Sequence, residues 1–409
     1  MRTIIKRIIS NKKFLSYGSM NVFQSFLVLL TNIIIARKMS VEGYGTYALI
    51  IMVLGLGLTL GFSWSSSAIL FYGGKEKAKN GNIRKTFWSR NLIIGIMVVL
   101  VLLLFVIFDN LINKYIGYEV GYGIFAWLIF RVISDYLIKY FLTIKKQNFS
   151  VFISLTIKLA FLLLVIFSSL SIKNIIYFGI ISESLSLLFI FKVDKNDLKN
   201  AILNKKYFKD ILNFSLWQFF GFSGLYIINF GDNAVIKHFM SVKEVGIYNA
   251  GYKLFAGLAR MSFIITNFYT SEIMEYIEFE NNAKLKNFFF KKRFLILILV
   301  LIPHIILIIF AKPLILNIFG INYKLAVSIF KILVVGSFIK YCGTFYIFYL
   351  NGMKKHKYLQ YINVLRAFLN IVLDIIFIQF LGIYGPALGT TIAILISFII
   401  LYAVSEGKI

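Results

Sequence analysis

Charged side chains are scarce in this chain of 409 residues, and their scarcity excludes an ordinary soluble domain. Only 15% of the residues are Asp, Glu, Lys or Arg, whereas 59% are hydrophobic. A soluble globular domain has about 25% charged and about 45–50% apolar residues. A soluble core this large would leave too few polar residues for a surface in contact with water. The hydrophobic supply instead fits about twelve membrane spans of about 20 residues each.

Residues and motifs that would support other chemistry are missing as well. The single cysteine, Cys342, excludes a disulfide framework. The histidines His238, His304 and His356 form no cluster with Cys or Asp at the spacing of metal ligands. No phosphate-binding P-loop occurs, so the chain itself does not hydrolyse ATP. We therefore expect no cofactor, no metal site and no enzymatic activity.

Hydrophobic runs place twelve predicted spans in two groups of six. The first group is expected at roughly 14–36, 44–71, 88–109, 118–142, 151–170 and 174–192. The second group is expected at roughly 211–236, 247–270, 293–311, 325–350, 359–380 and 386–404. The chain is thus predicted to be an all-α polytopic membrane protein, with six-helix bundles at 1–192 and 211–409 joined by a cytoplasmic linker at 193–210.

Lysine and arginine are distributed unevenly along the chain. They outnumber Asp and Glu by 44 to 17, and most of them fall in the termini, the linker and one set of alternate loops. This bias places both termini in the cytoplasm and supports an even number of spans. Anionic membrane lipids are expected to lie next to the basic loops. Because these loops are scattered between spans, nucleic-acid binding is the poorer explanation of the positive charge.

A repeated peptide indicates that the two bundles are related by duplication. Met39–Tyr47 reads MSVEGYGTY and Met240–Tyr248 reads MSVKEVGIY, so Met, Ser, Val, Gly and Tyr recur at an offset of 201 residues. Two similar halves are therefore expected to face each other. We expect Gly45 and Gly246 to lie in turns at the outer side of the membrane, and the peptide to mark these turns without a chemical role.

Five cations deep within predicted spans form the candidate substrate-binding site: Arg131, Lys158, Arg260, Lys340 and Arg366. A charge near the bilayer centre costs about 2.5–3.5 kcal/mol, so such residues favour a water-filled cavity. A second repeat, KKQNF and KKHKY, maps Arg131 onto Lys340 and Lys158 next to Arg366. We expect these cations to line one central crevice and to bind an anion such as a diphosphate. Pairing with acids, for example of Arg131 with Asp135, is the structural alternative.

Acidic residues within the predicted spans are fewer than the cations. Asp232, Asp374 and Glu183 are candidates for ion coupling, because each would sit at a depth where an acid is costly. The alternative for each is that it balances a nearby cation.

Three stretches resemble a known family: NIIIARKMSVEGYGTYAL, VGIYNAGYKLF and GIYGPALGTTIA. They are similar to Wzx-type polysaccharide flippases, which move O-antigen or capsule repeat units and belong to the multidrug/oligosaccharidyl-lipid/polysaccharide exporter superfamily. The resemblance implies a MATE-like V of two six-helix bundles. It also implies that a polyprenyl-diphosphate-linked oligosaccharide moves from the inner to the outer leaflet of a bacterial cytoplasmic membrane by alternating access. A polysaccharide polymerase and a chain-length regulator are further expected partners.

Two other functions stay open on the same composition. A MATE-like multidrug or small-molecule cation antiporter should carry cavity carboxylates, especially in the first span, which holds Asn21, Gln24 and Asn32 but no acid. A membrane glycan polymerase usually needs a long loop outside the membrane, whereas the predicted outer connections are all short. The flippase is therefore the preferred prediction.

Overall fold

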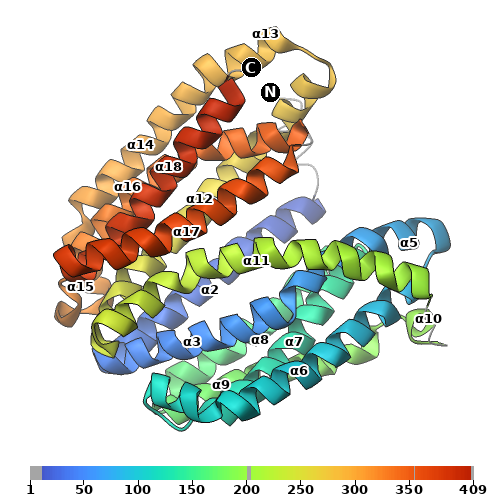
Figure 1. Cartoon of the computed structure of the whole chain (residues 1–409), viewed down its shortest axis with the longest axis horizontal. Coiled ribbons are helices and arrows are strands. Elements are labelled where there is room, and N and C mark those ends of the chain that lie inside the picture. Colours follow the sequence, from blue (N-terminus) through green and yellow to red (C-terminus); the bar gives the residue numbers. More distant parts are fainter. Residues whose placement is uncertain (1–11, 200–203, 354, 407–409) are drawn as a thin grey trace. The chain divides into compact units, whose positions relative to one another are not determined.

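The computed structural model describes residues 12–199, 204–353 and 355–406. The protein is built from helices (Figure 1). No strand occurs within these ranges, and the predicted all-α fold class is confirmed. The long helices are α2 Lys12–Lys38, α3 Val41–Gly61, α6 Arg84–Ile116, α7 Gly121–Thr143, α8 Gln147–Phe167, α9 Ile172–Ser184, α11 Lys205–Phe239, α12 Val242–Glu278, α14 Arg293–Ile309, α16 Ala326–Gly352, α17 His356–Leu381 and α18 Gly385–Glu406.

Shorter helical pieces join or extend the long helices. The short α-helices are α4 Ser66–Ala68, α5 Gly74–Asn80, α10 Lys195–Leu198, α13 Asn282–Asn287 and α15 Ala311–Phe319. The 3₁₀ segments are η1 Ser63–Ser65, η3 Leu185–Lys192, η5 Ile321–Tyr323 and η6 Gly382–Tyr384. The π-helical segments are η2 Ile69–Gly73 and η4 Phe288–Lys292.

Ten segments of the described chain are long and apolar enough to cross a membrane. One of them, 357–405, contains both α17 and α18, and α12 is not among the ten. The segment Ile172–Lys192 is formed by α9 and η3 together. The protein is therefore a multi-pass membrane protein, and its long helices follow the predicted spans to within several residues at most ends.

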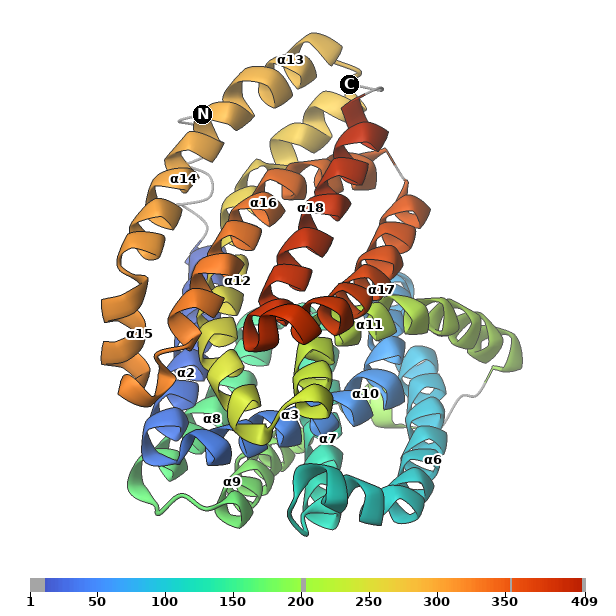
Figure 2. The same cartoon turned by 60° about the vertical axis from the view of Figure 1, so that its left-hand side comes forward.

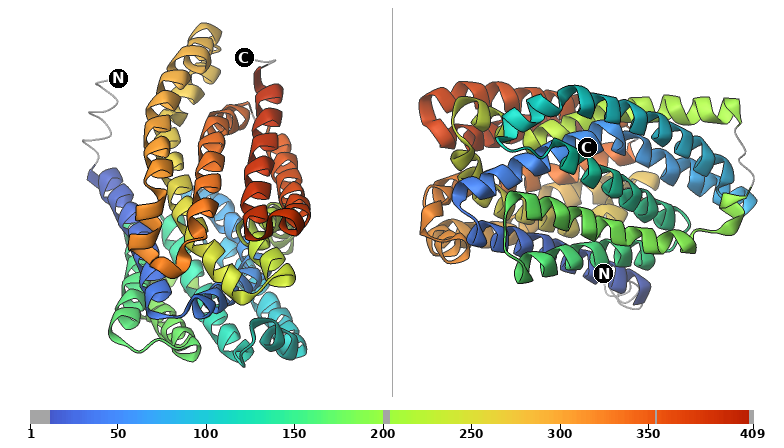
Figure 3. Two further views of the ribbon diagram at one scale, coloured as in Figure 1. Left: turned by 90° about the vertical axis from the view of Figure 1, so that its left-hand side faces the viewer. Right: turned by 90° about the horizontal axis from the view of Figure 1, so that it is seen from below.

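Two compact units divide the chain, and the division does not follow the linker. The first unit comprises residues up to 39 and 49–223, and the second comprises 40–48 and the residues from 224 onward. In the first unit α7 contacts α6, α8 and α9, while α8 also contacts α2 (Figure 3). In the second unit α18 lies between α16 and α17, and α12 packs on α16 (Figure 2).

The repeated peptide forms helix starts that pack on each other within the second unit. Ser40 and Ser241 each precede a helix, and their hydroxyls accept hydrogen bonds from the backbone N–H of Gly43 (3.0 Å) and Lys243 (3.2 Å). Because the serines begin the helices, Gly45 and Gly246 lie inside α3 and α12, and their predicted placement in turns is wrong.

Contact between these two helix starts is reciprocal. A Cβ atom on Gly45 would lie 1.9 Å from the carbonyl oxygen of Val242, and a Cβ atom on Gly246 would lie 2.2 Å from that of Val41. Each glycine thus faces the valine of the other copy of the repeat, as in contacts related by a twofold axis. Only glycine allows the two backbones to approach so closely.

Candidate functional site

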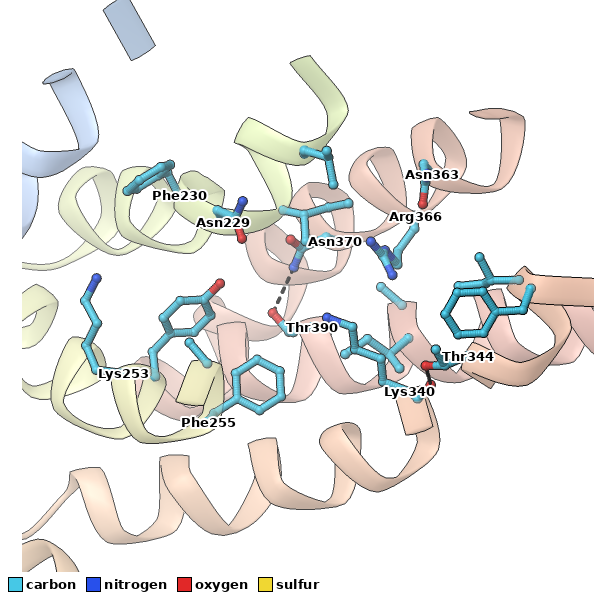
Figure 4. Close-up of a pocket in the computed structure, with 18 of the residues that line it drawn as sticks. Asn229, Phe230, Lys253, Phe255, Lys340, Thr344, Asn363, Arg366, Asn370 and Thr390 are labelled. Carbon is cyan, nitrogen blue, oxygen red and sulfur yellow. Dashed lines mark hydrogen bonds between the residues drawn. The ribbon is translucent and has the colours of Figure 1, made fainter. Parts of the chain in front are cut away.

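A cavity of about 770 Å³ opens within the second unit, between α11, α12, α16, α17 and α18 (Figure 4). Its cationic side chains come from three helices and are Lys253, Lys340 and Arg366. Its uncharged polar lining consists of Asn229, Tyr252, Thr344, Asn351, Asn363, Asn370 and Thr390. Neither Asp nor Glu is found among the described residues that line it. The cavity therefore carries an excess of positive charge.

Lys340 and Arg366 point into the same space from adjacent sides of the cavity (Figure 4). Lys340 lies on α16 and Arg366 on α17, and both side chains are partly buried. The Nε atom of Arg366 is buried, and none of the described protein atoms hydrogen-bonds to it. Two like charges in a poorly solvated space repel each other, and an anion between them would remove that repulsion. Lys253, by contrast, is directed away from this pair in Figure 4.

Two buried carboxyl groups lie behind one wall of the cavity. Asp232 on α11 and Asp374 on α17 are 3% and 0% exposed, and the two groups are within hydrogen-bonding reach of each other. The hydroxyl of Tyr248 donates to Asp232, and the hydroxyl of Thr390 also donates to Asp232 at 3.0 Å. The amide of Asn370 donates to both oxygens of Asp374, at 3.2 and 3.1 Å.

This acid pair is connected to the cavity by two of its lining residues. The Asn370 amide donates to the Thr390 hydroxyl at 3.0 Å, and both residues line the cavity (Figure 4). The Oδ1 atom of Asp232 is buried and accepts no hydrogen bond from the described atoms. Two adjacent buried carboxyl groups repel each other when both are ionised. No group of three or more His, Cys, Asp or Glu residues forms a metal-binding cluster in the described chain.

Arg131 and Glu183, predicted for substrate binding and for ion coupling, form an ion pair with each other in the first unit. Glu183 on α9 is 3% exposed and also accepts a hydrogen bond from the Ser134 hydroxyl. Asp135, the partner considered for Arg131 from the sequence, accepts instead from the Ser66 hydroxyl at 3.1 Å. Arg131 is therefore paired with a buried acid, and its role in substrate binding stays a prediction.

The other predicted cations are not found among the described residues that line the cavity. Lys158 on α8 is partly buried in the first unit and is not among the residues that line the cavity. Arg260 belongs to α12, but its side chain lies outside the described part of the chain. Of the five predicted cations, the structure brings together Lys340 and Arg366. The expected pairing of Arg131 with Lys340 in one crevice stays a prediction.

Sequence reasoning missed the polar partners of the acid pair, although two of them lie in motifs that it had singled out. Tyr248 is the last residue of the second MSV repeat, and Thr390 lies in GIYGPALGTTIA. The repeat therefore contributes a hydrogen bond to the acid pair. Asn370 lies four residues, about one helical turn, before Asp374, and this spacing was the available signal for their contact.

Comparison with solved structures identifies the fold. The lipid II flippase MurJ in an inward-closed conformation is 18% identical, with a TM-score of 0.68, over 95% of this chain and 87% of that one. An inward-facing multidrug-resistance MATE transporter is 14% identical, with a TM-score of 0.69, over 94% of each chain. A Pyrococcus furiosus transporter of the MOP superfamily, described as having a binding pocket of reversed polarity, is 16% identical, with a TM-score of 0.65, over 96% and 93%.

Sequence comparison identifies the family. No curated protein matches the chain. The model of a family described as polysaccharide biosynthesis protein matches residues 10–267, which is more than half of the chain. The chain therefore shares the fold of MurJ and the MATE transporters and belongs to the polysaccharide biosynthesis protein family.

Proposed function

We propose that this protein is a flippase that moves a polyprenyl-diphosphate-linked oligosaccharide from the inner to the outer leaflet by alternating access. The observation that carries the proposal is the pair Lys340 and Arg366, which point into one cavity whose described lining has no carboxylate. Membership of a polysaccharide biosynthesis family and the MurJ-like fold agree with a lipid-linked glycan as the cargo.

The chemistry of the two cations suits a diphosphate. Arginine offers paired N–H donors that match two phosphate oxygens, and lysine supplies a mobile point charge. Asn229, Asn351 and Asn363 add amide groups to the same cavity, and amides can both donate to and accept from sugar hydroxyls. In this scheme the polyprenyl tail stays in the lipid while the head group occupies the cavity.

The cavity's polarity separates this proposal from its alternatives. An exporter of cationic drugs needs acidic groups facing its substrate, whereas Asp232 and Asp374 lie behind the wall of this cavity and bond to its lining residues. A glycan polymerase is disfavoured because the described connections between long helices are short. We place the protein in a bacterial cytoplasmic membrane with both termini in the cytoplasm, beside a polysaccharide polymerase and a chain-length regulator, for O-antigen or capsule synthesis.

Reconstitution would test the function directly. The purified chain is placed in liposomes that contain a polyprenyl-diphosphate oligosaccharide on both leaflets, and a glycosidase added outside measures how much glycan becomes accessible. We expect the accessible fraction to rise from about half to near completion with the protein, and to stay near half in protein-free liposomes. Transport of a small cationic dye without movement of the glycan would instead support the exporter.

Ion coupling by the acid pair gives a separate prediction. Replacing Asp232 by asparagine is expected to abolish the acceleration of flipping by an imposed pH or sodium gradient, because one carboxylate can no longer repel the other. Slow flipping without a gradient should remain, since the cations of the cavity are intact. The same assay on Glu183→Gln serves as the comparison, because Glu183 pairs with Arg131 in the other unit. Equal gradient responses in the Asp232 variant and the unmodified protein would contradict the assignment.

A further inference from the structure

We propose that a second cavity, in the first unit, binds the phosphate-bearing headgroup of an anionic membrane phospholipid. It has a volume of about 400 Å³ and lies between the segment formed by η2 and α5, the start of α6 and the start of α11. The residues that line it are Tyr72, Lys75, Glu76, Lys79, Asn80, Lys85, Asn204, Tyr207 and Asp210. This site goes beyond the proposed transport function and does not depend on it.

Three lysines and two acids, Glu76 and Asp210, line this second cavity, so positive charge is in slight excess. Lys75, Lys79 and Lys85 come from two different helices, α5 and α6. Glu76 is 6% exposed, and its carboxylate already accepts from the backbone N–H of Lys85 and Thr86, both at 2.9 Å. It also accepts from the Thr86 hydroxyl at 2.8 Å. Because these donors stabilise Glu76 as a helix cap, its charge is directed at α6 and away from a ligand.

Two tyrosines form an aromatic wall beside the lysines. The rings of Tyr72 and Tyr207 meet edge to face, with their centroids 5.7 Å apart. The Tyr207 hydroxyl lies 3.0 Å from the Thr86 hydroxyl, which fixes it against α6. Tyr72 belongs to the π-helical segment η2, and π-helical turns are rare and occur frequently at functional sites. The π turn and the start of α5 place Tyr72 and Lys75 in the lining of one cavity.

The position of this cavity suits a lipid headgroup. The candidate spans Arg84–Ile116 and Tyr207–Phe239 both begin at it, so it lies at a boundary of the membrane. The sequence predicts that this boundary faces the cytoplasm, where anionic lipids are common. The neighbouring apolar cluster, which includes Trp64, Ile93 and Ile211 and has Tyr72 and Tyr207 packed against it, continues into the first unit. Basic pockets at the cytoplasmic ends of membrane helices are known to hold anionic headgroups.

Charge-matched variants of the full chain would test this site. In one variant Lys75, Lys79 and Lys85 are replaced by glutamine. In the control variant Lys284, Lys286 and Lys291 are replaced by glutamine; these exposed residues of α13 and η4 lie outside the cavity. Each variant is placed in phosphatidylcholine nanodiscs, and binding of a labelled phosphatidylglycerol is measured by titration.

We expect the first variant to bind phosphatidylglycerol about 100-fold more weakly, because each lysine near the surface contributes about 1 kcal/mol, or about fivefold. The control variant should change by less than about twofold. Equal losses in both variants would overturn the proposal, since they would reveal a general effect of surface charge. Displacement of the lipid by millimolar inorganic phosphate would also overturn the proposal, because it would assign the site to free phosphate. Equally tight binding of labelled phosphatidylcholine and phosphatidylglycerol would overturn it as well, because the site would then not select an anionic headgroup. If the triple variant does not fold, the single variant Lys79→Gln replaces it, with an expected loss of about fivefold.

Discussion

Replacing Arg366 by glutamine is expected to slow flipping of the lipid-linked glycan by at least about tenfold, while the protein still reaches the membrane. A hydrogen bond to a charged group contributes about 1.5–3 kcal/mol, and 1.4 kcal/mol corresponds to a tenfold change. Loss of the Nε–H group should leave no protein acceptor unpaired, because the Nε atom of Arg366 has no partner among the described protein atoms. The measurement is the glycosidase-accessibility assay, normalised to the amount of reconstituted protein.

Companion variants distinguish anion binding from a general loss of charge. Lys340→Gln should have an effect similar to that of Arg366→Gln, and the double variant should lose less than the product of the two, because both cations contact one ligand. Arg366→Lys should retain part of the activity, since it keeps the charge but not the paired donors. Lys331→Gln removes the same charge from an exposed position on α16, outside the cavity, and should leave flipping unchanged. Normal flipping in both single cavity variants would refute the anion-binding cavity.

The helices of this fold could be predicted from the sequence because hydrophobic length is a direct requirement of the membrane. The glycines show where such reasoning stops. Glycine is common in turns and so predicts turns at Gly45 and Gly246, yet both lie inside helices that touch backbone to backbone. A close approach between segments about 200 residues apart depends on tertiary packing, which residue type alone does not report.

In the candidate site, too, the sequence predicts some features, while others depend on tertiary packing. Depth in a predicted span, combined with the repeat, pointed to Lys340 and Arg366, and both face one cavity. The same criteria pointed equally to Arg131, whose partner Glu183 comes from another helix, 52 residues further along. The position of a charged residue within a predicted span shows that its burial costs free energy. Its partner is determined only when the helices pack. For that reason the acids could be named in advance, while the bonds from Tyr248 and Thr390, which come from other helices, could not.

Contact between the two copies of the repeat leads to the second large expected effect. Gly246→Ala should destabilise the protein by about 1–3 kcal/mol or more, because the added methyl group would lie 2.2 Å from the carbonyl oxygen of Val41. A backbone atom cannot rotate away as the end of a side chain can, so the starts of α3 and α12 must separate. Thermal unfolding in detergent, followed by the helical signal in circular dichroism, would measure the loss.

Reciprocity of this contact makes the prediction specific. Gly45→Ala should have a comparable effect, because its methyl group would lie 1.9 Å from the carbonyl oxygen of Val242. The double variant should cost less than the sum of the two, since separating the helices once relieves both clashes. Gly95→Ala on α6 is the matched control, because no atom lies within 4 Å of its added methyl group and alanine favours a helix. If the losses of stability in the two single variants add strictly, the two glycines act independently and the repeats do not form one shared contact. An equal loss of stability in the Gly95 control would lead to the same conclusion.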